Sequence, residues 1–439
     1  MFRASLVAPN PCKCATPATL QDEASSPRRA ILVAVQLPHT ADTEFQDSLA
    51  ELGRLAKTLG HLVVGTLVQK RSAFHVATYV GAGKIQELKA MVEALEAEAV
   101  LVEHEVTPSQ ARSLETALEV PVMDRTGVIL EIFHRHARSR AAKAQVEIVR
   151  LQYMAPRMRE LGAGGDRQRG GIGGKGAGES GIELDRRKIR DRVAELSAEL
   201  AQLSTEAETQ RSRRRDLHRV ALVGYTNAGK STLMRALTGS DVLVADKLFA
   251  TLDTTVRALV PETRPKILLS DTVGFIDNLP HGLVASFKST LDEALEASLL
   301  LHVIDASDRG WRRQWEVTKD VLAEIGAGLI PRWLLFNKFD KVGDAEAQAS
   351  LAQLLLAEWP EAVILSAKSS DDIRFLHARL ETRFRGHLVE DDVHIAYDRQ
   401  QLRALVFAEC EVLGERYDEA GVIFRVRATP ATLERLRAA

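Results

Sequence analysis

The chain contains little cysteine, few aromatic residues and no long hydrophobic run. Three cysteines occur in 439 residues. Cys12 and Cys14 have no second pair downstream, so neither a zinc site nor a disulfide framework is expected, which is typical of a reducing compartment. No apolar run reaches the roughly 18 residues of a membrane span, and the first residues lack the basic and apolar regions of a secretion signal. We expect a cytoplasmic monomer with no membrane span; partial association with a membrane stays open.

Charge is nearly balanced, with 58 basic and 60 acidic residues, but it is unevenly distributed. Residues 134–169 contain nine arginine or lysine residues against three acidic ones, and further basic clusters occupy 186–192 and 211–215. Such clusters attract phosphate. Because Tyr153 is nearly the only aromatic residue nearby, structured RNA suits them better than stacked single strands. The alternative is a solvated helix face with i,i+4 ion pairs.

Alternating strand-like and helix-like segments predict a multidomain α/β protein. A central doubly wound sheet is expected to bind ligands at the carboxyl ends of its strands, and its buried-type strands lie at 220–224, 266–271, 299–305, 332–337 and 362–366. In the last part of the chain, a helix is expected at 400–413 and a strand at 421–428. The expected divisions are a disordered tail or over-long gene start at 1–29, a small N-terminal α/β domain at 30–131, a helical linker at 132–216, the central domain at 218–388 and a small C-terminal α+β domain at 389–439.

The linker is expected to form two antiparallel, coiled-coil-like helices. Val146 and Val149 begin one apolar stripe. In the second helix, apolar residues recur at alternating spacings of four and three, a heptad seam, at Ile189, Val193, Leu196, Leu200 and Leu203. Residues 162–181 lie between the two helices and contain so many glycines, with interspersed basic residues, that no packed core is expected there.

One glycine-rich segment matches the phosphate-loop pattern G-x-x-x-x-G-K-[ST] and stands between an apolar strand and a helix. Its glycines let backbone N–H groups point at the α- and β-phosphates, Lys230 reaches the β- and γ-phosphates, and the Ser231 hydroxyl binds Mg²⁺. Alone, the loop indicates only a nucleoside triphosphate. It consists of Gly224, Tyr225, Thr226, Asn227, Ala228, Gly229, Lys230 and Ser231.

Two later motifs predict that the base is guanine. The N-K-x-D pattern follows a strand and consists of Asn337, Lys338, Phe339 and Asp340. The Asp340 carboxylate can accept from guanine N1–H and the 2-amino group, donors that adenine does not offer, and an unpaired carboxylate would disfavour ATP. Asn337 is expected to tie this turn to the phosphate loop, and the Lys338 stem to cover the base. A backbone N–H for guanine O6 is expected from Ser366, Ala367 and Lys368.

Two segments between these motifs are expected to respond to the γ-phosphate. A D-x-x-G segment consists of Asp271, Thr272, Val273 and Gly274. Asp271 would hold Mg²⁺ through a water, and the Gly274 amide would contact the γ-phosphate. The first switch is expected at Phe249, Ala250, Thr251, Leu252 and Asp253, with Thr251 as the magnesium ligand and Thr254 and Thr255 as alternatives. Lys230, Thr251 and Gly274 are the predicted catalytic groups.

The residue after Gly274 is Phe275, where small signalling GTPases carry the glutamine that orients the attacking water. Phenylalanine cannot orient water, so slow basal hydrolysis is expected. Asn227 suggests a remedy, because in some GTPases with this loop form the asparagine carbonyl helps to hold a monovalent cation such as K⁺. The alternative is that Asn227 only braces the loop.

Several segments outside these motifs resemble the HflX family of ribosome-associated GTPases, from about Ile31 onward. They are Tyr79-Val80-Gly81-Ala82-Gly83-Lys84, the segment Asp124-Arg125-Thr126-Gly127-Val128-Ile129-Leu130-Glu131-Ile132-Phe133, Ala144-Gln145-Val146-Glu147 continuing to Arg157, the glycine-rich loop, and Glu183-Leu184-Asp185-Arg186-Arg187. The resemblance implies a P-loop GTPase domain between the flanking domains, binding of GTP, GDP and the 50S ribosomal subunit, and dissociation of stalled or idle ribosomes, notably under stress. Ala177 stands where a proline is expected.

Two functions are consistent with these residues. The first is a GTPase whose cycle drives release from the ribosome and subunit separation. The second is a GTP-gated module for RNA binding or ribosome assembly in which hydrolysis is incidental. Stimulation of GTP turnover by 50S particles would separate them.

Overall fold

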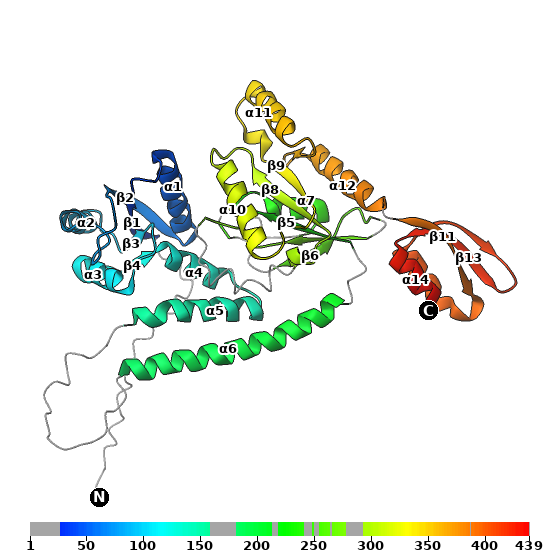
Figure 1. Cartoon of the computed structure of the whole chain (residues 1–439), viewed down its shortest axis with the longest axis horizontal. Helices are drawn as coiled ribbons and strands as arrows, with labels where there is room; N and C mark the ends of the chain where they lie inside the picture. The colour runs from blue at the N-terminus through cyan, green and yellow to red at the C-terminus, as the bar shows by residue number, and fades with distance from the viewer. Residues whose placement is uncertain are drawn as a thin grey trace, which may run out of the picture.

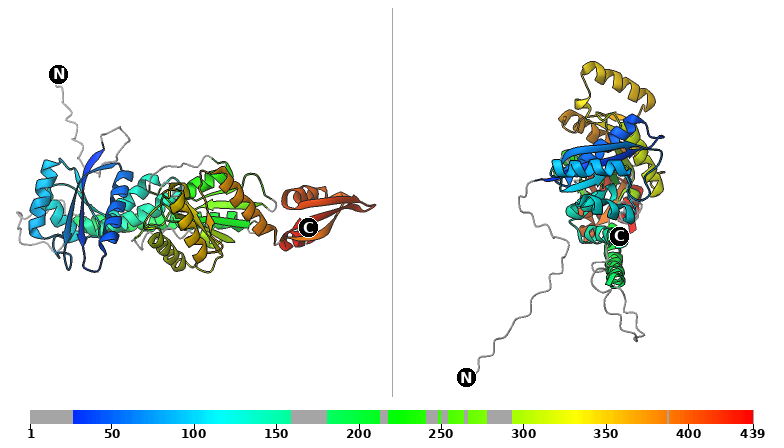
Figure 2. Two further views of the ribbon diagram at one scale, coloured as in Figure 1. Left: turned by 90° about the horizontal axis from the view of Figure 1, so that it is seen from above. Right: turned by 90° about the vertical axis from the view of Figure 1, so that its left-hand side faces the viewer.

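The computed structural model describes residues 27–158, 181–212, 218–240, 248–249, 254–263, 266–277, 293–386 and 388–438. These residues form three sheets with their helices, arranged in a row along the long axis of the molecule (Figures 1 and 2). The expectations for the tail up to residue 26 and for the glycine-rich loop up to residue 180 lie outside the described residues. The tail boundary at 29 is wrong by two residues, because Arg28 and Arg29 form the start of the first strand and pair with the second. Within the described ranges, no helix is both long enough and apolar enough to span a bilayer.

The N-terminal domain is a parallel four-stranded sheet in the order β2-β1-β3-β4. Strand β1 has two buried faces, because its side chains alternate. Leu32 and Ala34 pack with α1 and α4, whereas Ile31 and Val33 pack with α2 and α3. The elements are β1 (Arg28–Gln36), α1 (Asp42–Thr58), β2 (His61–Lys70), α2 (Ala82–Ala94), β3 (Ala99–Val102), α3 (Pro108–Leu118), β4 (Val122–Asp124) and α4 (Arg125–His136).

The linker consists of α5 (Arg140–Met154), the short 3₁₀ turn η1 (Ala155–Arg157) and α6 (Gly181–Ser212). Helices α5 and α6 lie side by side below the two α/β domains (Figure 1). The start of α5 meets the later part of α6, since Arg140 Nη2 is 2.8 Å from Glu199 Oε1. The prediction of two antiparallel helices is confirmed. The seam residue Leu196 is 4% exposed.

The central domain is a six-stranded sheet in the order β10-β9-β8-β5-β7-β6, in which only the edge strand β6 is antiparallel. The described helices pack on its faces. The strands are β5 (His218–Gly224), β6 (Thr255–Ala258), β7 (Ile267–Asp271), β8 (Leu299–Asp305), β9 (Arg332–Asn337) and β10 (Val363–Ile364). The helical elements are α7 (Lys230–Thr238), α10 (Trp311–Glu324), η2 (Phe339–Lys341), α11 (Ala345–Glu358) and α12 (Ser370–Arg385).

The C-terminal domain has its own core around Phe424 and an antiparallel sheet in the order β11-β13-β12. The predicted helix at 400–413 is too long: α13 ends at Glu409 and a strand begins at Glu411. Val412 pairs with Val426, and this edge strand completes the sheet, so tertiary pairing overrides the helical pattern there. The elements are β11 (Val389–Ala396), η3 (Tyr397–Arg399), α13 (Gln400–Glu409), β12 (Glu411–Tyr417), β13 (Gly421–Ala428) and α14 (Pro430–Ala438).

Candidate nucleotide-binding site

The phosphate loop connects β5 to α7, where the chain must turn tightly beneath a ligand. Gly229 has a φ of 101°, and a side chain there would clash with the Asn337 amide, so only glycine fits. Lys230 is buried and donates to the carbonyl oxygens of Gly224 at 3.0 Å and Tyr225 at 2.8 Å. Burial lowers the pKa of Lys230 to about 8. A phosphate group would supply the negative charge that this ammonium needs.

Two oxygen groups at the start of α7 and the end of β7 fit a magnesium ion. Ser231 Oγ donates to Asp271 Oδ2 at 2.7 Å. Asp271 is fully buried at the carboxyl end of its strand. A hydroxyl and a carboxylate in contact provide the hard oxygen donors that Mg²⁺ prefers. Nearby, Thr226 Oγ1 is buried and makes no hydrogen bond within the described part of the chain, which suits a loop that receives phosphate oxygens.

The guanine motifs meet the phosphate loop at the same end of the sheet. Asn337 Nδ2 donates to the Ala228 carbonyl at 2.8 Å, and its Oδ1 accepts the Ala367 N–H at 2.9 Å. Asn337 therefore joins all three loops, including the contact with the phosphate loop expected from the sequence. Ser366 Oγ donates to Asp340 Oδ1 at 2.7 Å, so the carboxylate expected to read the base is held in one orientation.

Asp305 was not singled out by the sequence motifs, although it ends the buried strand β8. Its Oδ2 is 2.8 Å from Lys338 Nζ, and both side chains are largely buried. Lys338 has a φ of 58°, a conformation that an unbranched side chain adopts only at some energetic cost. The ion pair thus holds the lysine stem beside the phosphate loop. A polar residue at the carboxyl end of a buried parallel strand was the signal that could have identified Asp305.

The D-x-x-G segment lies against the phosphate loop. A Cβ on Gly274 would be 2.9 Å from Lys230 Nζ, so this glycine sits directly beside the lysine. Phe275 N–H donates to the Gly224 carbonyl at 3.1 Å, and Thr226 N–H donates to the Phe275 carbonyl at 2.7 Å. Backbone hydrogen bonds on both sides of Phe275 therefore fix where Gly274 lies.

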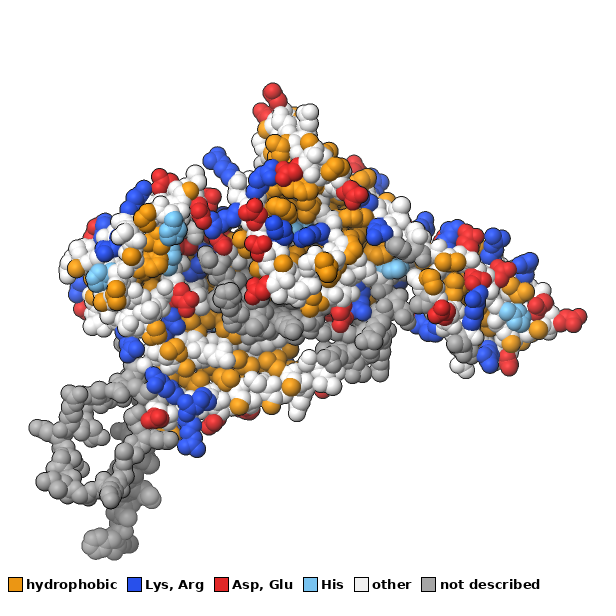
Figure 3. Space-filling model, in the orientation of Figure 1, with side chains coloured by type: hydrophobic (Ala, Val, Ile, Leu, Met, Phe, Trp, Pro, Cys, Tyr) orange, Lys and Arg blue, Asp and Glu red, His pale blue; other side chains and the backbone are white. Residues whose placement is uncertain are grey.

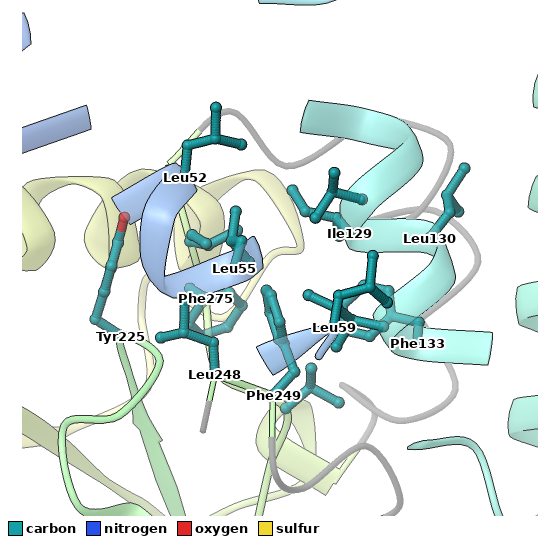
Figure 4. Packing of buried hydrophobic residues seen from close by; sticks show 14 of the residues in the cluster. Leu52, Leu55, Leu59, Ile129, Leu130, Phe133, Tyr225, Leu248, Phe249 and Phe275 are labelled. Carbon is teal, nitrogen blue, oxygen red and sulfur yellow. The ribbon is translucent and has the colours of Figure 1, made fainter. Parts of the chain in front are cut away.

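The Phe275 side chain is buried between the two α/β domains. Figure 4 shows it in one apolar cluster with Tyr225, with Leu55 of α1 and with Leu59, the residue that follows this helix. Phe275 is 3% exposed. Its ring therefore contributes to interdomain packing, which agrees with the expectation that it does not orient water.

The first switch lies largely outside the described residues. Ala250, Thr251, Leu252 and Asp253 are not described, so the magnesium role of Thr251 stays a prediction. Phe249 is described and its ring packs on Phe133, with centroids 4.5 Å apart. Its carbonyl accepts from His136 Nδ1 at 2.8 Å. Phe249, the first residue of the predicted switch, is thus held by the N-terminal domain, a contact that the sequence did not suggest.

Basic side chains are exposed on the first turns of α6, where Figure 3 shows lysine and arginine gathered at one end of the linker. Lys188 pairs with Asp185 at 3.0 Å and Arg192 with Glu195 at 2.6 Å, so part of this cluster is neutralised within the helix. Arg157 belongs to the N-terminal domain instead, because it contacts Asp124 at 3.1 Å and is 18% exposed. The exposed cluster comprises Arg186, Arg187, Lys188, Arg190 and Arg192.

Three family models match successive parts of the chain. They are described as "GTP-binding GTPase N-terminal" over residues 46–134, "GTP-binding GTPase Middle Region" over 136–214 and "50S ribosome-binding GTPase" over 219–338. The boundary between the first two falls near the end of α4, which also spans the expected division at 131 and 132.

Whole-chain relatives carry the name "GTPase HflX". The protein of Gluconacetobacter diazotrophicus is 50% identical over 93% of this chain and 97% of its own length. That of Escherichia coli is 38% identical over 89% of this chain and 91% of its own length. A solved structure of a GTP-binding protein from Sulfolobus solfataricus in complex with GDP is 24% identical, with a TM-score of 0.44, over 80% of this chain and 99% of that chain.

Proposed function

We propose, given that this chain belongs to the HflX family of GTPases, that it binds the 50S ribosomal subunit and uses its GTP cycle to dissociate stalled or idle ribosomes. The chain is a GTPase by that membership. The single observation that carries the wider proposal is the combination of a guanine-nucleotide site with an exposed basic helix hairpin in one chain. The family-model description "50S ribosome-binding GTPase" supports the choice of partner.

The roles of the site residues are part of this proposal. Lys230 would pair with the β- and γ-phosphates, and Gly274 N–H would meet the γ-phosphate. Ser231 and Thr251 would hold Mg²⁺ directly and Asp271 through a water, and the ion would neutralise charge that develops on the phosphates. Asp340 would read guanine, with Asn337 and Ser366 keeping its turn in place. Lys230→Ala should abolish measurable nucleotide affinity, and GTP binding that survives this change would overturn the phosphate-loop assignment.

Basal hydrolysis should be slow because no glutamine follows Gly274, so the attacking water must be oriented by another group. One candidate is a K⁺ ion held by the Asn227 carbonyl, at a loop residue with a φ of 59°. Turnover in K⁺ should then exceed turnover in Na⁺ at equal ionic strength. Equal rates in the two salts would leave Asn227 as a brace of the loop.

The ribosome role is tested by turnover and by sedimentation. Purified 50S particles should stimulate GTP hydrolysis strongly, and 70S ribosomes incubated with the protein and GTP should separate into subunits in sucrose gradients. A non-hydrolysable analogue and GDP show which nucleotide state acts. Lys230→Ala serves as the control, because it should bind no nucleotide. No stimulation by 50S particles would favour the alternative, a GTP-gated RNA-binding or assembly module with incidental hydrolysis.

A cytoplasmic location and a monomeric state complete the proposal. Both suit a protein that acts on ribosomes through a single extended hairpin. Fractionation of cells should find the protein with 50S particles, and its mass in light scattering should match one chain.

A further inference from the structure

The Tyr225 hydroxyl joins the phosphate loop to the N-terminal domain. It donates to Oε1 of Glu51 on α1 at 2.7 Å and accepts the backbone N–H of Asp277 at 2.8 Å. Tyr225 is 6% exposed and Glu51 is 5% exposed. Because Glu51 Oε1 accepts this bond, the hydroxyl proton of Tyr225 points toward Glu51. The lone pairs of the hydroxyl oxygen are then available to accept the Asp277 N–H.

Glu51 is in turn fixed by a buried ion cluster of the N-terminal domain. Its Oε2 accepts from Arg125 Nη2, and Arg125 Nη1 donates to Glu103 Oε1 at 3.0 Å. Arg125 Nη2 also lies 3.4 Å from the Asp277 carbonyl oxygen. Since these side chains are buried, solvent screens their interactions little. The backbone of Asp277 is therefore held through both its N–H and its carbonyl.

The same segment places Gly274 beside the lysine of the phosphate loop. Phe275 is hydrogen-bonded to the loop on both sides, and its ring packs against α1 (Figure 4). These contacts hold Gly274 against the phosphate loop, next to Lys230, where the terminal phosphate of GTP would lie. A donor that is already in place loses less conformational entropy when its ligand binds.

We propose that Glu51 is a positioning residue of the GTP site, acting through the Tyr225 hydroxyl to hold the backbone after Gly274 in place for the γ-phosphate. The N-terminal domain thereby contributes to the preference for GTP over GDP, because only GTP carries the phosphate that Gly274 contacts. The inference rests on the γ-phosphate role proposed for Gly274 and does not depend on ribosome binding.

Nucleotide affinities of two full-length variants test this role. Tyr225→Phe removes the hydroxyl and keeps the packed ring, and Glu51→Gln weakens the carboxylate acceptor. Each should weaken binding of a non-hydrolysable GTP analogue by about fivefold to tenfold, the effect of one or two hydrogen bonds. GDP affinity should change by less than about twofold on the same grounds. The double variant should bind the analogue no more weakly than Tyr225→Phe alone, because both changes act through one hydroxyl.

Glu103→Gln is the matched control. It removes a carboxylate from the same buried cluster but does not touch Tyr225. Because Glu103 reaches Asp277 only through Arg125, analogue affinity should fall by less in Glu103→Gln than in Glu51→Gln, and GDP affinity should stay at the wild-type value. The turnover number with GTP should be lower in the Tyr225 and Glu51 variants. If Glu51→Gln fails to fold, the Tyr225→Phe comparison decides.

Three results would overturn the proposal. They are an equal loss of analogue and GDP affinity, a loss in Glu103→Gln as large as in Glu51→Gln, and tighter analogue binding or faster hydrolysis in Tyr225→Phe. Gly274→Ala tests the underlying assignment separately, since its Cβ would crowd Lys230. If that variant keeps the preference for the analogue over GDP, the γ-phosphate assignment fails, whatever Glu51 does.

Discussion

The proposed preference for guanine depends on a single side chain, Asp340. Its carboxylate lies on a turn just after β9 and accepts a hydrogen bond from the Ser366 hydroxyl. The neutral amide of asparagine has nearly the same shape, but it replaces one acceptor oxygen by an NH₂ group, which only donates. With the proposed role, specificity at this position would depend on hydrogen-bonding capacity and not on size.

Asp340→Asn should lose guanine preference. GTP affinity is expected to fall by about a thousandfold, since mismatched buried polar groups discriminate strongly. Xanthine carries a carbonyl where guanine carries its amino group, so the variant should bind xanthosine triphosphate better than the wild type does. Competition binding with both nucleotides measures this, and Ser366→Ala, which keeps the carboxylate, should retain the guanine preference. Weak binding of both nucleotides by Asp340→Asn would indicate a damaged loop instead.

Glu103 should make the stability of the protein depend on pH. Burial raises the pKa of this carboxyl to about 7, against the opposing effects of Arg125 and Ser48. In the unfolded chain this carboxyl titrates near 4.5. Between these two pH values the folded protein binds more protons, so stability is greatest below the lower value and falls as pH rises through the upper one. The contribution is up to about 3 kcal/mol.

Denaturant unfolding at pH 5 and pH 8 tests this assignment. Glu103→Gln carries no titrating carboxyl, so its stability should depend less on pH than that of the wild type. Parallel pH dependence in the two proteins would show that Glu103 is ionised throughout.

The elements show where sequence patterns suffice and where they do not. The glycine, lysine and serine spacing of the phosphate loop predicted correctly that the loop joins β5 to α7. This prediction succeeds because the local backbone geometry of the loop requires those residues at those positions. The seam residue Leu196 likewise identified the contact surface of α6. By contrast, the strand that begins at Glu411 exists only because β13 pairs with it. The pairing of Glu51 with Tyr225 joins residues 174 positions apart, so no local pattern could indicate it.

Leu196→Ala should loosen the helix hairpin without altering the nucleotide site. Leu196 is 4% exposed, and removing a buried leucine costs about 2–5 kcal/mol. We expect faster proteolysis within the linker and weaker 50S binding, with unchanged GDP affinity. Leu184→Ala is the matched control, because Leu184 is 44% exposed on the same helix. Loss of GDP affinity in Leu196→Ala would show that the linker supports the G site directly.

At the scale of the whole molecule, the first two α/β domains share one hydrophobic cluster in addition to clusters of their own, while the C-terminal domain has a separate core. Leu248 and Phe249 from the central domain lie in the cluster with α1 and α4 (Figure 4). The Leu248 N–H donates to Thr58 Oγ1, and the Phe249 carbonyl accepts from His136 Nδ1. The N-terminal and central domains should therefore behave as one cooperative unit.

Two truncations test this division. A protein that begins at residue 218 would expose Leu248, Phe249 and Phe275, each less than 5% exposed in the full chain. It should melt at a lower temperature and bind a hydrophobic dye. A protein that ends at residue 388 should keep the melting temperature and GDP affinity of the full chain. Equal melting of the two truncated proteins would contradict a shared core.

The burial of Phe275 has a consequence for anyone who wishes to accelerate this enzyme. Restoring the glutamine of signalling GTPases at this position would put an amide into a hydrocarbon environment, at a cost of about 1–3 kcal/mol, and would aim it at α1 instead of at the nucleotide. Phe275→Gln is therefore not expected to raise the rate of GTP hydrolysis. A water-orienting group would have to come from elsewhere, either from an ion held at the phosphate loop, as proposed above for Asn227, or from a neighbouring molecule that reaches the nucleotide.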